Sequence, residues 1–439
     1  MTVLFLQSPY SFLFRDIGLE LKNKNINSYA LTFNLGDKYI YKGIKQFDIH
    51  KMINKELPIK IDEKKMNKII SIENYYSKKK EKILNEELTE DEKKYFYAYT
   101  EILKKIIKKK DINMILMQND TRWQHALAIY IANKLNIDYL VFELGLFRPN
   151  TITIDSKGVN YNNSIPREKG YYENINIKEK FDYTKVDSEI SEFKRNLIVS
   201  KYMFYYKLGE ILGKNSIENK KIRLVDYFNR FFKTYIKKSK RNEKKIAELP
   251  KNYIFVPFQV VNDSQTLVHS DFNNMKEFAE TVIKGVNNYN NKIKDKKISL
   301  VFKEHPMDVG KVKYDEFYDK YSDNQNIIFL KSGNTKKLIK NSKLIITINS
   351  TVGIEALEMH KKVICLGKAF YSIDGIAQKS NDENLATDIE DILSKELNEN
   401  LINNFIDYLK YNYQYQGNEY YYNNKQVKRI SKMILKYIK

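Results

Sequence analysis

SLVFKEHP (residues 299–306), LIITINSTVGIEAL (344–357) and KVICL (362–366) are the segments that best predict the architecture of this chain. Each contains a short apolar run, and helical patterns lie between them. Short β-branched runs that alternate with helical patterns predict βαβ units on a buried parallel sheet. Ligands of such sheets bind at the carboxyl ends of the strands. The Glu-His-Pro and Asn-Ser-Thr turns both fall at such ends.

These two turns predict an anion site. Ser350 and Thr351 are expected at a helix N-terminus, where free N–H groups and the helix dipole attract phosphate. His305 projects from the neighbouring turn, whose backbone Pro306 fixes. Each turn alone also has a purely structural explanation, as a buried His-Pro turn or an ordinary helix cap. The sequence has no G-x-x-x-x-G-K-[ST] loop and no G-x-G-x-x-G, which removes the main support for an ATPase or a dinucleotide enzyme.

Four strand-like runs in the first half of the chain also end in polar residues. The runs are 3–6, 28–33, 113–117 and 139–142, and the polar residues that follow them are Gln7, Asn34, Asp120, Arg122, Glu143 and Arg148. A carboxylate at a strand end beside glycine suits acid–base or nucleophilic chemistry, and Arg148 can hold an anionic substrate. The alternative is that Glu143 only pairs with Arg148 or Arg122.

A further strand, 253–257, precedes a dense polar loop. This loop contains Gln259, Asn262, Asp263 and His269, and it is too long for a simple turn. We therefore expect it to face a ligand.

These patterns predict an α/β protein with a GT-B-like fold, in which two Rossmann-like domains with parallel sheets face a central cleft. The expected domains are residues 1–247, with helical insertions and a basic helical connection, and residues 248–395. Residues 396–439 are expected to form helices that pack back on the first domain. No D-x-D occurs at a strand end, which favours a metal-independent donor with a nucleoside monophosphate leaving group. Lys303, His305, Ser350 and the helix dipole could neutralise that group.

Composition points to an anionic partner. The 439 residues carry a net charge of +21, and the single cysteine fits a reducing compartment. Basic blocks lie at 78–82, 104–110, 237–245 and 425–439, and the simplest explanation is solvated helix faces. Residues 102–110 and 430–439, however, combine apolar residues and lysines at helical spacing, which suits an anionic lipid surface better than nucleic acid. We see no signal peptide and no spanning run.

The chain resembles the capsule polysaccharide synthesis proteins of the KpsS/LipB type. The resemblance lies in a set of motifs that occur in order between residues 3 and 375. They are FLQSP (5–9), FNLGD (33–37), DTR (120–122) with His125, FELG (142–145) with RP (148–149), GVN (158–160), VPFQ (256–259) with NDSQ (262–265), KEHPMD (303–308) and NSTVG (349–353).

The resemblance implies a β-Kdo transferase that uses CMP-Kdo and a phosphatidylglycerol-type lipid at the inner face of the cytoplasmic membrane. His305, Pro306, Ser350 and Thr351, with Lys303 and Asn349 beside them, would hold CMP. Glu143 would be the catalytic carboxylate, as nucleophile or as acid–base group.

Other residues take lesser roles in this interpretation. Leu144 stands where related enzymes have a second acid, so Asp120 or Asp263 is expected to contribute. Arg122 and Arg148 would bind the Kdo carboxylate or the lipid phosphate. The remaining predicted substrate contacts are Gln7, Asn34, Gln259, Asn262 and His269.

The expected partners are the CMP-sugar donor, the anionic lipid, the membrane surface and other capsule synthesis proteins, with no metal, no further cofactor and no nucleic acid. Two alternatives stay open, a transferase for another CMP-activated acid such as a sialic acid and a non-catalytic export scaffold. A nucleic-acid binder fits least, because it leaves the two polar turns unexplained.

Overall fold

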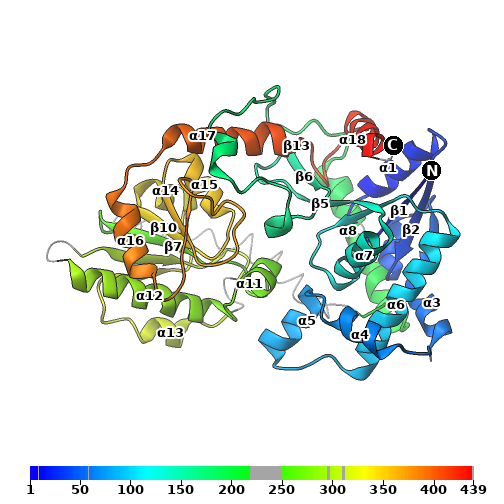
Figure 1. The fold of residues 1–439 in the computed structure, drawn as a ribbon, viewed down its shortest axis with the longest axis horizontal. Helices are drawn as coiled ribbons and strands as arrows, with labels where there is room; N and C mark the ends of the chain where they lie inside the picture. The colour runs from blue at the N-terminus through cyan, green and yellow to red at the C-terminus, as the bar shows by residue number, and fades with distance from the viewer. Residues whose placement is uncertain (8, 58, 218–248, 294–296, 309–311, 438–439) are drawn as a thin grey trace. The chain divides into compact units, whose positions relative to one another are not determined.

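The structure, a computed structural model, describes residues 1–7, 9–57, 59–217, 249–293, 297–308 and 312–437. The chain divides into two compact units. The first consists of Met1–Ser164, Ile177–Asn219 and Lys410–Lys439, and the second of Ile165–Asn176 and Lys220–Leu409. Each unit is built on its own sheet (Figure 1).

In the described residues, the first unit has a seven-stranded sheet with the order β13-β6-β5-β4-β1-β2-β3. The strands are β1 (Thr2–Phe5), β2 (Asn27–Thr32), β3 (Lys45–Asp48), β4 (Met114–Gln118), β5 (Asp138–Leu144), β6 (Thr151–Asp155) and β13 (Tyr415–Gln416). The strands from β5 to β3 are parallel, whereas β6 and β13 each run antiparallel to their neighbour. The helices are α1 (Leu13–Lys22), α2 (Leu35–Ile40), α3 (Ile49–Glu56), α4 (Glu63–Ile70), α5 (Tyr75–Lys79), α6 (Glu90–Lys109), α7 (Trp123–Leu135), α8 (Glu192–Ile211) and α18 (Asn424–Tyr437).

Different helices cover the two faces of this sheet, because successive side chains of a strand point to opposite faces. Leu4 of β1 packs in one apolar cluster with α6 and α7, which contribute Ile102 and Leu127. Its neighbour Phe5 packs in a second cluster with α1 and α18, which contribute Ile17 and Ile430. The first unit is therefore a three-layer α/β sandwich.

The second unit has a six-stranded parallel sheet in the described residues, with the order β12-β11-β10-β7-β8-β9. The strands are β7 (Tyr253–Pro257), β8 (Ser299–Lys303), β9 (Ile327–Leu330), β10 (Leu344–Thr347), β11 (Lys362–Cys365) and β12 (Gln378–Lys379). The helices are α11 (Ser264–His269), α12 (Met275–Lys292), α13 (Asp315–Asp319), α14 (Thr335–Asn341), α15 (Val352–Glu358), α16 (Leu385–Ser394) and α17 (Glu399–Asp407). Within this unit, α12 and α13 cover one face of the sheet, and α14 and α15 lie on the other (Figure 1).

The predicted α/β, GT-B-like class with two Rossmann-like domains is confirmed, and β7 and β8 have the predicted bounds. The first unit departs from the prediction at its edges. Residues 45–48, in the domain predicted to carry helical insertions, form the parallel edge strand β3, and 151–155 form the antiparallel strand β6. Strand β5 extends to Leu144, so Glu143 lies within the strand rather than after it.

The domain bounds also differ from those expected. Residues 165–176 belong to the second unit, although they lie within the predicted first domain. The C-terminal region is divided, because α17 packs on α15 in the second unit whereas α18 packs on α1 in the first. The expected return of the whole segment 396–439 to the first domain is therefore correct only from Lys410 onward.

The two segments predicted to lie on lipid bury their apolar faces inside the first unit. In α6, Ile102, Leu103 and Ile106 are at most 4% exposed, and in α18 Ile430 and Ile434 are at most 2% exposed. The lipid prediction is wrong for the apolar faces of these helices, because those faces build the core. The basic block 237–245 and most of the predicted helical connection lie outside the described residues. In the described part of the chain, no helix is long and apolar enough to cross a bilayer.

Candidate active site

Glu143 lies near the carboxyl end of β5, next to the end of β4. Asn119, which follows β4, has a left-handed backbone (φ 65°) and donates from Nδ2 to Glu143 Oε2 at 3.0 Å. The backbone N–H of Leu144 donates to Glu143 Oε1 at 3.0 Å. Because Glu143 is only half-buried, its carboxylate is positioned by two donors and still reaches solvent. This geometry suits a nucleophile or a general base.

Glu419, in the loop between β13 and α18, is a second carboxyl group of this site. It is 1% exposed, and Gln118 at the end of β4 donates from Nε2 to Glu419 Oε2 at 2.9 Å. Its other oxygen, Oε1, has no hydrogen-bond partner. Burial, and next the charge of Glu143, raise the pKa of Glu419 well above its usual value, while Arg122 and Arg148 oppose the shift. Glu419, Glu143 and the two arginines therefore share one electrostatic environment.

Glu419 is not among the residues predicted from the sequence, because residues 396–439 were expected to be only helices. The one local signal is the polar turn Gly417-Asn418-Glu419. Gly417 has φ 150°, and a Cβ there would lie 2.5 Å from the Gln426 side chain. Glycine is therefore needed at this position. The turn brings a carboxyl group beside β4, about three hundred residues away in sequence, and no local pattern predicts that contact.

Asp120 is a third carboxyl group at this end of the sheet. Its Oδ2 accepts hydrogen bonds from the Val159 N–H at 3.1 Å and from Asn162 Nδ2 at 2.9 Å, whereas Oδ1 has no partner. Burial raises the pKa of Asp120 to about 6. Gly158 permits the close approach of this loop, because a Cβ there would lie 2.7 Å from Asp120 Oδ2. Asp120 therefore ties the 158–162 loop to the end of β4.

Arg122 and Gln7, each predicted to follow a strand, are brought together because β4 and β1 are neighbours in the sheet. Arg122 Nη1 and Gln124 Nε2 each donate to Gln7 Oε1 at 2.7 Å. Arg122 as a whole residue is half-buried. This arrangement fixes a cation beside the carboxyl groups.

Arg148 extends from a tight loop that follows β5. Its Nε donates to the carbonyl of Gly145 at 3.2 Å, and the Arg148–Pro149 peptide bond is cis. A Cβ on Gly145 would lie 2.0 Å from Thr151 Oγ1, so only glycine allows the loop to fold onto β6 at this point. Arg148 itself is exposed and available to an anionic ligand.

Two other residues from the sequence motifs have structural roles. Asn34, predicted to contact substrate, is 1% exposed and caps α2 by accepting the Asp37 N–H at 2.8 Å, and its Nδ2 donates to the Tyr202 hydroxyl at 3.3 Å. His125 is fully buried, its Nδ1 lies 2.8 Å from the Asn119 carbonyl, and burial lowers its pKa to about 3. A neutral His125 therefore supports the Asn119 turn.

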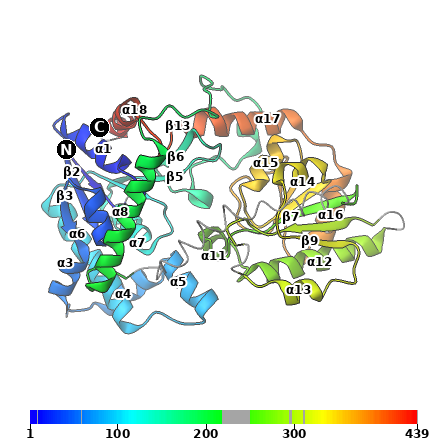
Figure 2. The ribbon, with the colours of Figure 1, turned by 180° about the vertical axis from the view of Figure 1, so that it is seen from behind.

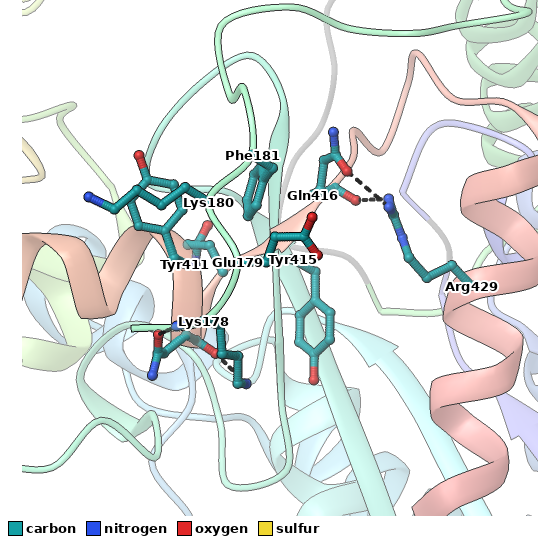
Figure 3. A pocket seen from close by; sticks show the side chains of 10 residues that line it. Lys178, Glu179, Lys180, Phe181, Tyr411, Tyr415, Gln416 and Arg429 are labelled. Carbon is teal, nitrogen blue, oxygen red and sulfur yellow. Dashed lines mark hydrogen bonds between the residues drawn. The ribbon is translucent and has the colours of Figure 1, made fainter. Parts of the chain in front are cut away.

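A pocket of about 320 Å³ lies within the first unit, between the 178–181 segment and β13 (Figure 3). It is lined by Lys178, Glu179, Lys180, Phe181, Tyr411, Asn412, Gln414, Tyr415, Gln416 and Arg429. Gln414 connects the pocket to the site, because its Oε1 accepts the Leu146 N–H at 2.9 Å and its Nε2 donates to Thr153 Oγ1 at 2.8 Å. Thr153 pairs directly with Glu143 across the sheet. Three cationic residues and three aromatic rings make the pocket suitable for an anionic saccharide.

In the second unit, Gln259 and Asn349 link the ends of β7 and β10. Gln259 Nε2 donates to Asn349 Oδ1, and the Asn349 N–H donates to Gln259 Oε1, both at 3.0 Å. Asn349 Nδ2 also donates to the carbonyls of Gln265 and His269. Because their polar atoms bond one another and the backbone, both residues hold the loop in place. The ligand contacts expected of them stay predictions.

His305 and Pro306 form an accessible turn after β8. Pro306 is exposed and His305 half-buried, and His305 Nδ1 accepts the Met307 N–H at 3.2 Å. Lys303, at the end of β8, is 5% exposed, and its Nζ donates to the Glu304 carbonyl at 3.3 Å. Burial lowers the pKa of Lys303. The imidazole of His305 is therefore better exposed to a phosphate than the Lys303 amine.

Ser350 and Thr351 precede α15 as predicted. Thr351 is exposed and has no side-chain capping bond, whereas Ser350 Oγ accepts the Val352 N–H at 3.2 Å. Helix α15 has seven residues. The Tyr371 hydroxyl donates to the Ser350 carbonyl at 2.5 Å, and a Cβ on Gly353 would lie 2.4 Å from that hydroxyl oxygen. Tyr371 thus fixes the turn through the Ser350 carbonyl, while Thr351 is exposed to solvent.

The remaining predicted residues lie in the 259–269 loop. Asp263 caps α11, and its Oδ1 accepts the Gln265 N–H and the Ser264 hydroxyl at 3.3 Å. Burial raises the pKa of Asp263 and the nearby His305 opposes the shift, so these two side chains are neighbours. Asn262 has a left-handed backbone with φ 65°. His269 is 3% exposed, and burial lowers its pKa to about 4.

In the described residues, no group of three or more His, Cys, Asp or Glu could hold a metal ion.

Residues 113–420 match the family described as capsule polysaccharide biosynthesis protein. The chain belongs to this family. The matched range includes every carboxyl group of the site described above, Glu419 among them.

The curated relatives agree with this assignment and with the predicted KpsS/LipB resemblance, which is confirmed. The chain is 29% identical over 290 residues to the capsule polysaccharide export protein KpsS of Escherichia coli, covering 62% of this chain and 71% of that one. It is 26% identical over 304 residues to the capsule polysaccharide modification protein LipB of Neisseria meningitidis serogroup A, covering 64% and 70%. A solved structure, the β-Kdo 2,7 transferase of Thermosulfurimonas dismutans KpsC, aligns with a TM-score of 0.36 at 14% identity over 82% of this chain and 95% of that one.

Proposed function

We propose that this protein is a glycosyltransferase that moves Kdo from CMP-Kdo to a phosphatidylglycerol-type lipid and so begins the Kdo linker of a capsular polysaccharide. Membership of the capsule family supports the biological context. The observation that carries the chemistry is the group of Glu143, Glu419, Arg122 and Arg148 at one sheet end of the first unit. An anionic sugar needs cations to bind it and a carboxylate to react with it, and this group supplies both.

Glu143 is the proposed nucleophile. Its carboxylate oxygen attacks the anomeric carbon of Kdo as the bond to the CMP phosphate oxygen breaks, and CMP leaves with the bonding electron pair. A hydroxyl of the lipid then attacks the same carbon, Glu143 leaves as the carboxylate, and the hydroxyl proton passes to a base. Two inversions retain the configuration of the donor. Burial raises the pKa of Glu419, which keeps negative charge at the site low enough for the Kdo carboxylate to bind between Arg122 and Arg148.

The donor is proposed to bind the second unit through the His305-Pro306 turn and the Ser350-Thr351 turn. The exposed Thr351 hydroxyl and the His305 imidazole would contact the phosphate of CMP, with Asp263 beside His305. Lys303 would act through its backbone rather than through its charge, because its amine is buried. The reaction is proposed to need no metal ion and no cofactor besides the donor.

The acceptor places the protein on the inner face of the cytoplasmic membrane, beside other capsule synthesis proteins. Net charge +21 supports binding to an anionic bilayer and an anionic donor. Nucleic acid is not part of the proposal.

The test is a turnover assay with each donor and acceptor varied separately. Purified protein would receive CMP-Kdo, generated in situ, or CMP-sialic acid, with a fluorescent phosphatidylglycerol analogue or a neutral lipid, with and without EDTA. Mass spectrometry should show one added Kdo on the anionic lipid in the presence of EDTA. If product forms with CMP-sialic acid and not with CMP-Kdo, the donor is CMP-sialic acid instead of CMP-Kdo. No product from either intact donor would contradict the proposed activity and favour a scaffold.

The covalent step has its own readout. Acid quenching during turnover, followed by peptide mass spectrometry, should show one Kdo on the peptide that contains Glu143. An inverted product with no adduct would contradict the nucleophile role and make Glu143 a general base.

A further inference from the structure

Helix α8 packs on the first unit with one of its two apolar faces. Tyr202 is 2% exposed, and its hydroxyl bonds both Asn34 and Asp37 of the α2 region. A Cβ on Gly36 would lie 2.7 Å from the Tyr202 ring, so α2 and α8 are in close contact. This inner face consists of Ile198, Val199, Tyr202, Tyr206 and Gly209. The helix is therefore held firmly by one side.

The outer face of α8 is also apolar, although it is exposed. Phe193 is 79% exposed, Phe204 64% and Ile211 81%. At 100° per residue, positions 11 and 18 residues apart lie on the same side of a helix. Leu197, at 44% exposure, falls on the same stripe. Figure 2 shows α8, in green, on the near side of the first unit.

This stripe is unusual for the surface of this protein. In the described residues, six of the twelve exposed large apolar side chains lie between residues 193 and 212. Single exposed apolar residues are normal, but a contiguous stripe marks an interaction surface. The two helices that the sequence suggested for lipid, α6 and α18, bury their apolar faces in the core.

Cations lie beside the stripe. Lys194 and Lys201 are exposed, and on helical spacing both fall on one edge of it. Lys207 lies near the other edge, where Glu210 accepts from its Nζ at 2.5 Å. Arg195 faces away from the stripe, with its guanidinium over the Tyr420 ring at 5.3 Å. Bulky apolar residues with lysines along the border are typical of helices that lie in the interface of an anionic bilayer.

We propose that the outer face of α8 docks the protein on an anionic lipid bilayer. Phe193, Phe204 and Ile211 enter the acyl-chain boundary, and Lys194 and Lys201 contact the phosphate groups. A helix of 20 residues is about 30 Å long, so it lies flat along the surface. The combination of apolar and cationic residues favours lipid over a protein partner. The inference deepens the proposed function, because a lipid acceptor must be reached at a membrane surface.

The test is co-sedimentation of the purified full-length protein with vesicles of phosphatidylglycerol mixed with phosphatidylcholine, or of phosphatidylcholine alone. Wild-type protein should bind the anionic vesicles at least about tenfold more tightly, because surface lysines each add attraction to anionic lipid. The variant Phe193→Ser/Phe204→Ser/Ile211→Ser should bind them at least about tenfold more weakly than wild type, since three apolar side chains no longer enter the bilayer. Leu84→Ser is the matched control, because Leu84 is 50% exposed but lies far from α8 in sequence.

Circular dichroism and thermal unfolding check that the triple variant is folded. We expect it to fold because the three substituted side chains are exposed to solvent and are not part of the core. Unchanged vesicle binding of a folded triple variant would overturn the proposal, as would wild-type protein that binds no vesicles. Light scattering adds a third outcome. A wild-type dimer that the triple variant converts to a monomer, without vesicle binding by either, would assign the stripe to contact between copies.

A separate readout distinguishes this proposal from the proposed function. The triple variant should transfer Kdo normally to a short-chain, water-soluble acceptor and poorly to the same headgroup in a bilayer. If neither variant nor wild type transfers Kdo, the proposed function fails, while the vesicle measurement still decides the role of α8.

Discussion

At the carboxyl ends of β4 and β5 in the first unit, one buried carboxyl oxygen of Asp120 and one of Glu419 have no hydrogen-bond partner. At the ends of β7 and β10 in the second unit, by contrast, the buried amides of Gln259 and Asn349 bond each other in both directions. The first arrangement costs folding free energy because burial disfavours the charged carboxylates. The second arrangement links two strand ends through hydrogen bonds in which Gln259 and Asn349 are each other's partners.

This difference separates two roles that the sequence motifs could not separate. Groups held in an unfavourable environment are typical of reactive sites, because a perturbed pKa is useful for chemistry. Groups that satisfy one another give a rigid loop on which exposed side chains such as His305 and Thr351 can be presented. We therefore expect substitutions in the first unit to change the reaction and its pH dependence. Those in the second should change donor binding or the stability of its loop.

The largest effect is expected from Glu143→Gln. The turnover number for Kdo transfer should fall by about 10² to 10⁴, the range for loss of a catalytic proton-transfer or nucleophilic group. Steady-state kinetics with circular dichroism of the folded protein measures it. Glu189→Gln, an exposed glutamate of the same unit, is the control and should keep full activity. Activity within tenfold of wild type would remove Glu143 from the chemistry.

Asp120→Asn should alter the pH dependence of stability. Between pH 3.8 and about 6 the folded Asp120 keeps a proton that the unfolded carboxyl group releases. The free energy of unfolding therefore falls as pH rises through this window, by about 3 kcal/mol for this group. The variant lacks that fall, so its stability relative to wild type should increase from pH 4 to pH 7. Urea unfolding at both values measures it, with Asp138→Asn as the exposed control.

Asn349→Ala should destabilise the second unit by about 2 kcal/mol, because Gln259 Nε2 loses its acceptor and the Gln265 carbonyl loses its donor. A lower temperature for one thermal transition would show it. Asn273→Ala, an exposed asparagine of the same unit, should change nothing. If Asn349→Ala weakens donor binding while stability is unchanged, Asn349 is a ligand contact after all, and the contrast between the two sheet ends disappears.

His305→Ala is expected to have the smallest effect, a KM for the donor about tenfold higher with the turnover number nearly unchanged, as for one lost phosphate contact. His360→Asn is the matched control. Asparagine is chosen there because residue 360 has φ 51°, which asparagine tolerates. A large fall in the turnover number alone would indicate that His305 takes part in the chemical step.

The sequence predicted most of the second unit and half of the first site. β7 and β8 were predicted to the residue, because β-branched runs bounded by proline or by polar turns leave little alternative. Glu143, Arg122 and Gln7 were predicted as site residues because each follows an apolar, strand-like run in the sequence. Strand β3 was missed because its four residues are polar or half-buried and lack an apolar run. The structural contacts of Asn34 and Asn349 were not predicted, because a polar residue at a strand end looks the same whether it faces a ligand or the backbone.

The sequence by itself determined the α/β class, the family motifs and the strand ends at which polar residues gather, because these depend on local periodicity and on turns. Only the tertiary structure decided which of those residues meet. It brought Glu419 to Gln118 across about three hundred residues, and it buried α6 and α18 while leaving the outer face of α8 exposed. Such outcomes depend on how much apolar area each helix face can bury against neighbouring elements. Hydrophobic burial is therefore a property of packed elements rather than of any single segment.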